Sequence, residues 1–154
     1  MRRHIPFVLF FLVLGIAPIT AWAHGDPIAE AIFLVNNVWM MVATFLVFIM
    51  HLGFATLESG LTRAKNTTNI LFKNTAIVSI GLLSYALLGF GLMYPGEDFA
   101  GKMFGFKGWG LSLPEGGEGV AYAGGHYTYW TDFLFQAMFA ATGATIVSGA
   151  VAER

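Results

Sequence analysis

Apolar residues run in three long stretches along the chain, and shorter polar or glycine-rich segments separate them. The stretches lie at about 28–58, 69–94 and 129–152. Each is long enough to cross a hydrocarbon core of about 30 Å, which needs roughly 20 apolar residues. A helix is the one single segment that satisfies its own backbone hydrogen bonds in lipid. The pattern therefore predicts an all-α membrane protein with three transmembrane helices.

The first 23 residues have a different pattern. Arg2 and Arg3 precede an apolar run over residues 7–16, and Ala21 and Ala23 flank a tryptophan as a small-x-small motif. A basic start, a short apolar core and such a motif are typical of a secretory signal peptide. We expect cleavage after Ala23, with an uncleaved signal anchor as the alternative.

Charge in the two connecting segments predicts the orientation. The short connection after the first helix carries Arg63 and Lys65, whereas the loop at 95–128 is long, glycine-rich and has more acidic than basic residues. Basic loops stay in the cytoplasm. The long loop and the mature N-terminus are therefore expected in the periplasm, and the C-terminal end in the cytoplasm. With the signal peptide, this places a multi-pass protein in a bacterial inner (cell) membrane.

Composition excludes several classes of function. Hydrophobic residues make up 56% of the chain and charged residues 11%, against about 25% charged in soluble domains. The net charge of −1 gives no attraction to nucleic acid. The chain has no cysteine, and its four histidines are scattered. No catalytic set, metal site or cofactor is expected, so the sequence does not predict an enzyme.

The third apolar stretch is rich in glycine and alanine, which lets helices approach closely in lipid. It should be buried among other helices, and three helices are too few to surround it. Phe135 and Phe139 lie four residues apart, so both fall on one helical face beside Gln136. Spacing alone favours an aromatic packing ridge. The alternative is a vestibule that attracts cations to the ring faces.

Polar residues near the inner end of the first stretch have simpler interpretations. Glu58, Arg63 and Lys65 are expected to be interfacial anchors. His51 lies about two turns before Glu58. An ionisable side chain within a membrane span is a functional candidate, but for His51 we favour a hydrogen bond between helices.

Two motifs resemble a known family. Residues 51–66 (HLGFATLESGLTRAKN) with 69–74 (NILFKN) resemble the end of the first helix and first cytoplasmic loop of the Amt/Mep/Rh ammonium transporters. Residues 135–140 (FQAMFA) with 149–154 (GAVAER) resemble their third helix. The resemblance identifies residues 24–154 as the N-terminal part of an ammonium transporter domain.

The resemblance implies an eleven-helix fold, of which this chain supplies three helices, and a homotrimer in the intact protein. It implies transport of ammonium or ammonia, with methylammonium as a related substrate. Ammonium is recruited at an outer aromatic site and loses its proton before a hydrophobic passage. By motif, Phe139 corresponds to a gate phenylalanine, Phe135 lines the recruitment site, and Gln136 accompanies them.

Other parts of the family pattern fall after Arg154, so the chain alone is not expected to conduct. These are the recruitment tryptophan and serine, an aspartate, the second gate phenylalanine and two pore histidines. The chain could be a truncated reading frame, a fragment, or a piece complemented by another chain. A different class stays open: a short, non-conducting membrane protein that interacts with or regulates a full-length transporter. An unrelated three-helix membrane enzyme is a third reading, with no catalytic set to support it.

Overall fold

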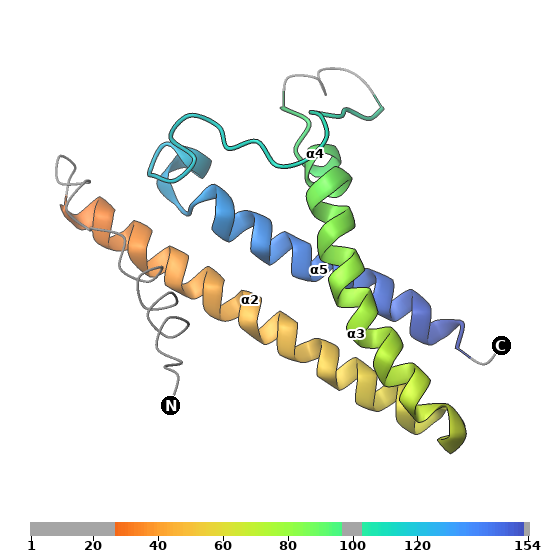
Figure 1. Cartoon of the computed structure of the whole chain (residues 1–154). Coiled ribbons are helices and arrows are strands. Elements are labelled where there is room, and N and C mark those ends of the chain that lie inside the picture. Colours follow the sequence, from red (N-terminus) through yellow and green to blue (C-terminus); the bar gives the residue numbers. More distant parts are fainter. Residues whose placement is uncertain (1–26, 97–102, 153–154) are drawn as a thin grey trace, which may run out of the picture.

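The computed structural model describes residues 27–96 and 103–152. In this part of the chain three helices are long and apolar enough to cross a membrane (Figure 1). They are α2 (Pro27–Leu61), α3 (Thr67–Ser84) with its continuation, and α5 (Tyr129–Ala150). The predicted all-α class with three transmembrane helices is confirmed. The expected signal peptide, its cleavage site and Arg154 lie outside the described residues.

The helix ends differ slightly from the apolar stretches. α2 begins at Pro27 and runs to Leu61, three residues past the expected end. Proline suits the first helical turn because its missing N–H has no helical partner there. A single 3-10 turn, Ala64–Asn66, then leads into α3. α5 begins after Thr128, whose hydroxyl accepts a bond from the Thr131 N–H.

The second crossing is not a regular α-helix throughout. α3 passes into a π-helical turn, Tyr85–Gly89, and then into the short α4, Phe90–Met93. At this end two carbonyls bind the following loop: Leu87 O accepts from the Gly110 N–H at 2.8 Å, and Gly91 O accepts from the Lys107 N–H at 3.0 Å. The loop is therefore held against the end of the helix by backbone bonds.

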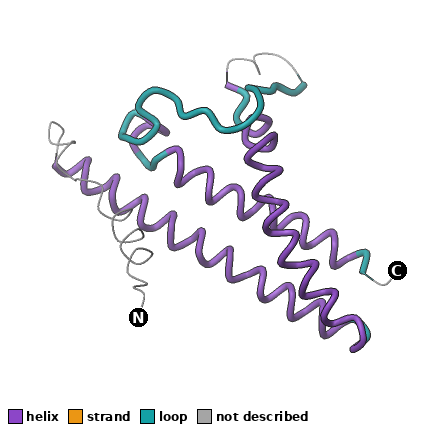
Figure 2. The backbone as a smooth tube through the Cα atoms, viewed as in Figure 1, coloured by secondary structure: helices purple, strands orange, loops and turns teal. Residues whose placement is uncertain are grey.

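The chain crosses from one side to the other along α2, returns along α3 and α4, and crosses again along α5 (Figures 1 and 2). α5 packs against both other long helices. Its side chains Ala137, Ala141 and Thr145 are fully buried. The third apolar stretch was expected to be buried among other helices, and α5 is packed in this way at these small residues, which allow close approach.

Much apolar surface stays exposed on the described helices, notably along α2 and on one face of α5. An exposed apolar surface of this extent is stable against lipid or further helices, and costly in water.

Gly81 of α3 sets the distance between α3 and α5. A Cβ built at Gly81 would lie 2.9 Å from the Ala141 Cβ and 3.1 Å from its Cα. Gly81→Ala should therefore push the helices apart and lower the free energy of unfolding in detergent by about 1–3 kcal/mol. Gly53→Ala on α2 is the matched control, because nothing lies within 4 Å of the Cβ there. Equal stability of the two variants would contradict the close crossing.

Candidate functional site

The three residues predicted to line a pathway lie together on α5. The Phe135 and Phe139 rings meet edge to face, with centroids 4.9 Å apart and planes at 64°. Phe135 and Gln136 are half-buried, and Phe139 is 45% exposed. One turn further, a Cβ at Gly143 would meet nothing within 4 Å. The predicted pair of rings is present, and it borders an open face of the helix.

In the part of the chain that the structure describes, α5 packs against its neighbours with its other faces. The side chains that α5 buries against its neighbours belong to other positions, such as Ala137, Ala141 and Thr145. The rings of Phe135 and Phe139 offer π faces to a cation, an attraction of about 0.5–2 kcal/mol. Gln136 adds a neutral amide that can donate and accept hydrogen bonds. Aromatic rings and a neutral amide are side chains with which a small cation can interact.

His51 lies between α5 and α2, against Thr142 and Thr145 of α5. Its Nε2 is 3.4 Å from the Thr142 hydroxyl, and its Nδ1 is 3.4 Å from the Thr145 hydroxyl. All three side chains are buried. The expected hydrogen bond between helices is confirmed.

Asn37 joins α2 to the start of α5. Its Oδ1 accepts from the Thr128 N–H at 3.0 Å and from the Thr131 hydroxyl at 2.8 Å. Its Nδ2 donates to the Phe33 carbonyl of its own helix. With His51, Asn37 holds α5 against α2 on both sides of the Phe135–Phe139 pair.

Glu58 is not the exposed interfacial anchor that the sequence suggests. It is 5% exposed and lies where α2, α3 and α5 meet. Its Oε2 accepts from Asn74 Nδ2 at 3.0 Å and forms an ion pair with Lys73 at 2.8 Å. A Cβ at Gly149 would lie 2.8 Å from Glu58 Oε1. The interpretation was wrong because the glycine on α5 makes room for a buried carboxylate that position alone does not reveal.

Asp132 was missed by the sequence analysis. It is 2% exposed in the first turn of α5. Tyr94 donates to its Oδ1 at 3.1 Å and Tyr122 donates to its Oδ2 at 2.8 Å. The nearby helix N-terminus also favours a negative charge. A carboxylate within an apolar stretch, close to several tyrosines, was the available signal.

The two tyrosine hydroxyls are held as donors. Burial raises the pKa of Tyr122, and its hydrogen bond to Asp132 raises it further. Burial and the charge of Asp132 likewise raise the pKa of Tyr94. Both hydroxyls therefore keep their protons well above the ordinary tyrosine pKa of about 10.

Because the pKa values of these tyrosines are raised in the folded state, the stability of the protein should depend on pH in the alkaline range. The folded state holds these protons more tightly than the unfolded state, so the stabilisation is complete below the unfolded pKa. It is lost as pH rises from about 10 towards the folded pKa values. The melting temperature in detergent should fall over this range, and Tyr94→Phe with Tyr122→Phe should flatten the fall. An unchanged slope in the double variant would contradict the network.

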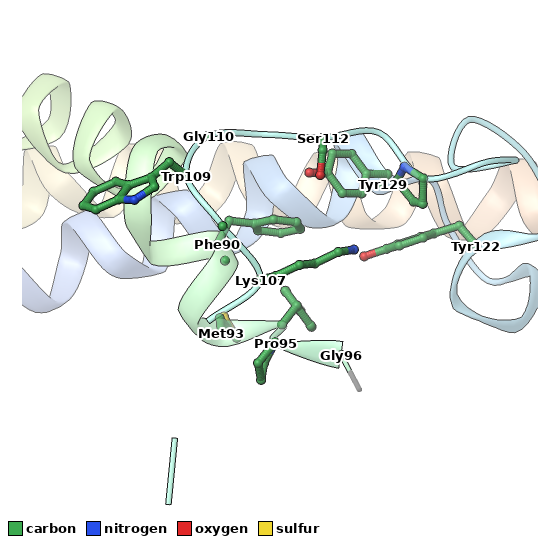
Figure 3. Close-up of a pocket in the computed structure, with 14 residues that line it drawn as sticks. Phe90, Met93, Pro95, Gly96, Lys107, Trp109, Gly110, Ser112, Tyr122 and Tyr129 are labelled. Carbon is green, nitrogen blue, oxygen red and sulfur yellow. The ribbon is translucent and has the colours of Figure 1, made fainter. Parts of the chain in front are cut away.

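A pocket of about 400 Å³ lies where the loop folds over the end of α4. Figure 3 shows Phe90, Trp109, Tyr122 and Tyr129 around it, with the Lys107 side chain extending across towards Tyr122. Two of the lining rings, Phe90 and Tyr129, pack edge to face with centroids 5.0 Å apart. Tyr122, which also lines the pocket, links it to Asp132 through its hydroxyl. Among the described residues no group of three His, Cys, Asp or Glu could hold a metal.

Comparison with known proteins gives consistent matches. The sequence pattern of the Ammonium Transporter Family matches residues 38–154. The protein sll1017 of Synechocystis sp., named as an ammonium transporter, is 44% identical over 148 residues, which is 96% of this chain and 31% of that protein. Ammonium transporter Amt1 of Haloferax mediterranei is 46% identical over 126 residues, covering 78% of this chain and 21% of its own.

A solved structure is also similar. The structure named Sensor Amt Protein superimposes with a TM-score of 0.64 and 30% sequence identity, covering 81% of this chain and 29% of that chain. The chain therefore spans about a third or less of the length of these relatives.

Proposed function

This chain belongs to the ammonium transporter family, and from that membership we propose that its α5 forms one wall of an ammonium pathway. Family membership also agrees with the prediction of a membrane transporter class rather than an enzyme. In the proposal, Phe135 and Gln136 meet ammonium at the outer side and Phe139 forms part of a gate below them. The remaining walls come from further helices of the full-length fold.

The observation that carries this proposal is the paired rings on an open helix face. Phe135 and Phe139 are in contact, and Phe139 remains 45% exposed although the opposite side of α5 is tightly packed. Ring faces attract ammonium by about 0.5–2 kcal/mol, which recruits the cation without trapping it. Burying an unpaired ammonium in hydrocarbon costs far more than burying neutral ammonia. Loss of the proton before the gate would therefore lower the barrier.

The proposal includes an orientation and an assembly. The turn at Arg63 and Lys65 faces the cytoplasm and the aromatic loop before α5 faces the periplasm of a bacterial inner membrane, as the positive-inside rule favours. The full-length protein forms a homotrimer, with ammonium or ammonia as substrate and methylammonium as an analogue.

A chimera tests this function with the whole chain. The chain replaces the matching portion of the Synechocystis relative, and uptake of labelled methylammonium is measured in a host without its own ammonium transporters. The chimera should take up the label at a rate within about tenfold of the unmodified relative. The relative lacking that portion is the control. Uptake no greater than this control would refute the proposal.

The same chimera distinguishes transport from a second candidate function, ammonium binding without conduction. The solved relative is named as a sensor, and a chain that binds ammonium without conducting would fit the alternative of a regulatory membrane protein. In that case ammonium should stabilise the chimera against heat without measurable uptake.

A further inference from the structure

His51 contacts α5 at two points. Its two ring nitrogens face the hydroxyls of Thr142 and Thr145, each at 3.4 Å, and the Thr142 hydroxyl is itself bonded to the backbone carbonyl of Met138. The two threonines lie about one turn apart on α5. The histidine is 6% exposed, so the contacts are made away from solvent.

Phe139 lies about one turn before these threonines. It directly follows Met138 and precedes Thr142 by three residues. A helix advances by about 100° per residue, since it has 3.6 residues per turn. Fixing Thr142 and Thr145 against α2 therefore fixes the direction in which the Phe139 side chain leaves the helix. α3 adds a contact next to Thr142, because Gly81 packs on Ala141.

The hydrogen-bond partners around His51 favour one tautomer of the imidazole. The Thr142 hydroxyl donates to Met138 O at 2.9 Å, and the Thr145 hydroxyl donates to Ala141 O at 3.2 Å. A neutral imidazole has one donor nitrogen and one acceptor nitrogen. Because the shorter of the two backbone bonds commits the Thr142 hydroxyl as a donor, this hydroxyl can only accept from the ring, and Nε2, which faces it, carries the hydrogen. The other nitrogen, Nδ1, then acts as an acceptor and faces the Thr145 hydroxyl. That hydroxyl shares its hydrogen between Nδ1 and the more distant backbone acceptor, the Ala141 carbonyl.

The surroundings favour the neutral ring. The side chains of α5 that contact His51 are threonines, which carry no charge. Glu58, two turns along α2, is engaged with Lys73 and Asn74 of α3. A buried imidazolium without an anionic partner would be costly.

From these contacts we infer that His51, as a neutral Nε2–H imidazole, is a positioning residue that sets the rotation of α5 at Phe139. The inference rests on the proposed function, because Phe139 matters as a gate. It assigns His51 no contact with substrate. The histidine acts through the helix that carries the gate, from the side that faces α2.

Transport by variants of the chimera tests this role. His51→Leu should lower the maximal rate of methylammonium uptake per folded protein about tenfold, with little change in KM, because the outer wall at Phe135 is untouched. His51→Gln places an amide donor near the Nε2 position and should recover most of the rate. His51→Asn reaches only the Nδ1 position and should not. His126→Leu, in the exposed loop, is the control and should match the parent.

Two results would overturn the inference: an unchanged rate in His51→Leu, or a His51→Gln variant no better than His51→Leu. A rate that falls only as the amount of folded protein falls would also overturn it, since that is a purely structural role.

Nitrogen NMR of labelled histidine in the intact chain gives a readout without transport. The His51 signals, identified by their loss in His51→Gln, should show the neutral Nε2–H form with a hydrogen-bonded Nδ1. Thr145→Val should shift the Nδ1 signal, whereas Thr56→Val, on the exposed side of α2, should not. A Nδ1–H or charged ring near neutral pH would refute the assignment even if the chimera proved unable to transport.

Discussion

Replacement of Asp132 by alanine should destabilise the protein more than any other single substitution considered. Its carboxylate accepts from Tyr94 and Tyr122 while 2% exposed. Hydrogen bonds to a charged group contribute about 1.5–3 kcal/mol each, and the truncation leaves both hydroxyls without their acceptor. We expect the free energy of unfolding in detergent to fall by about 3–5 kcal/mol. Equilibrium unfolding followed by circular dichroism measures it.

The control for this prediction is Glu115→Ala, which removes an exposed carboxylate from the same loop region and should change stability by less than about 0.5 kcal/mol. A double-mutant cycle with Tyr122→Phe should show coupling, because the two side chains share one bond. Additive effects, or an Asp132→Ala variant as stable as the control, would show that the carboxylate does not hold the loop.

Phe139→Ala should lower methylammonium uptake by the chimera about 2- to 30-fold at low substrate concentration. The range corresponds to losing a ring–cation attraction of about 0.5–2 kcal/mol. Phe135 also loses the ring that contacts it at 4.9 Å. The measurement is the initial rate of labelled uptake, normalised to the amount of protein in the membrane.

Phe45→Ala is the matched variant for this comparison. Phe45 is 62% exposed on α2, so its truncation removes the same apolar ring from a surface outside the proposed pathway. Its uptake should stay close to that of the parent. Equal losses in the two variants would remove Phe139 from the gate and leave it as a lipid- or helix-packing residue.

The sequence predicts the helices well for a physical reason. A membrane span must be a continuous apolar run of about 20 residues, so α2, α3 and α5 are visible in the local pattern. Phe135 and Phe139 are also local, because residues four apart on a helix are neighbours. Their contact could therefore be predicted, although their role in transport stays a proposal.

The polar contacts could not be predicted in the same way. Asp132 binds Tyr94, 38 residues earlier, and His51 meets Thr142 and Thr145 more than 90 residues later. Such pairs depend on how the helices rotate and cross, which no local period encodes. Glu58 shows that position in the sequence is not sufficient for such a prediction. It lies near a basic turn, yet α5 covers it because Gly149 has no side chain at the point of contact.

Labelling of single cysteines tests the central claim, that the chain crosses a bilayer and places the aromatic loop and the basic turn on opposite sides. The chain has no cysteine of its own, so each introduced thiol reports one position. Glu115→Cys should react with an impermeant maleimide added to cells whose outer membrane has been permeabilised. Ala64→Cys should react only after the inner membrane is opened as well. Reaction of both residues under the same condition would contradict the membrane arrangement on which the proposed pathway depends.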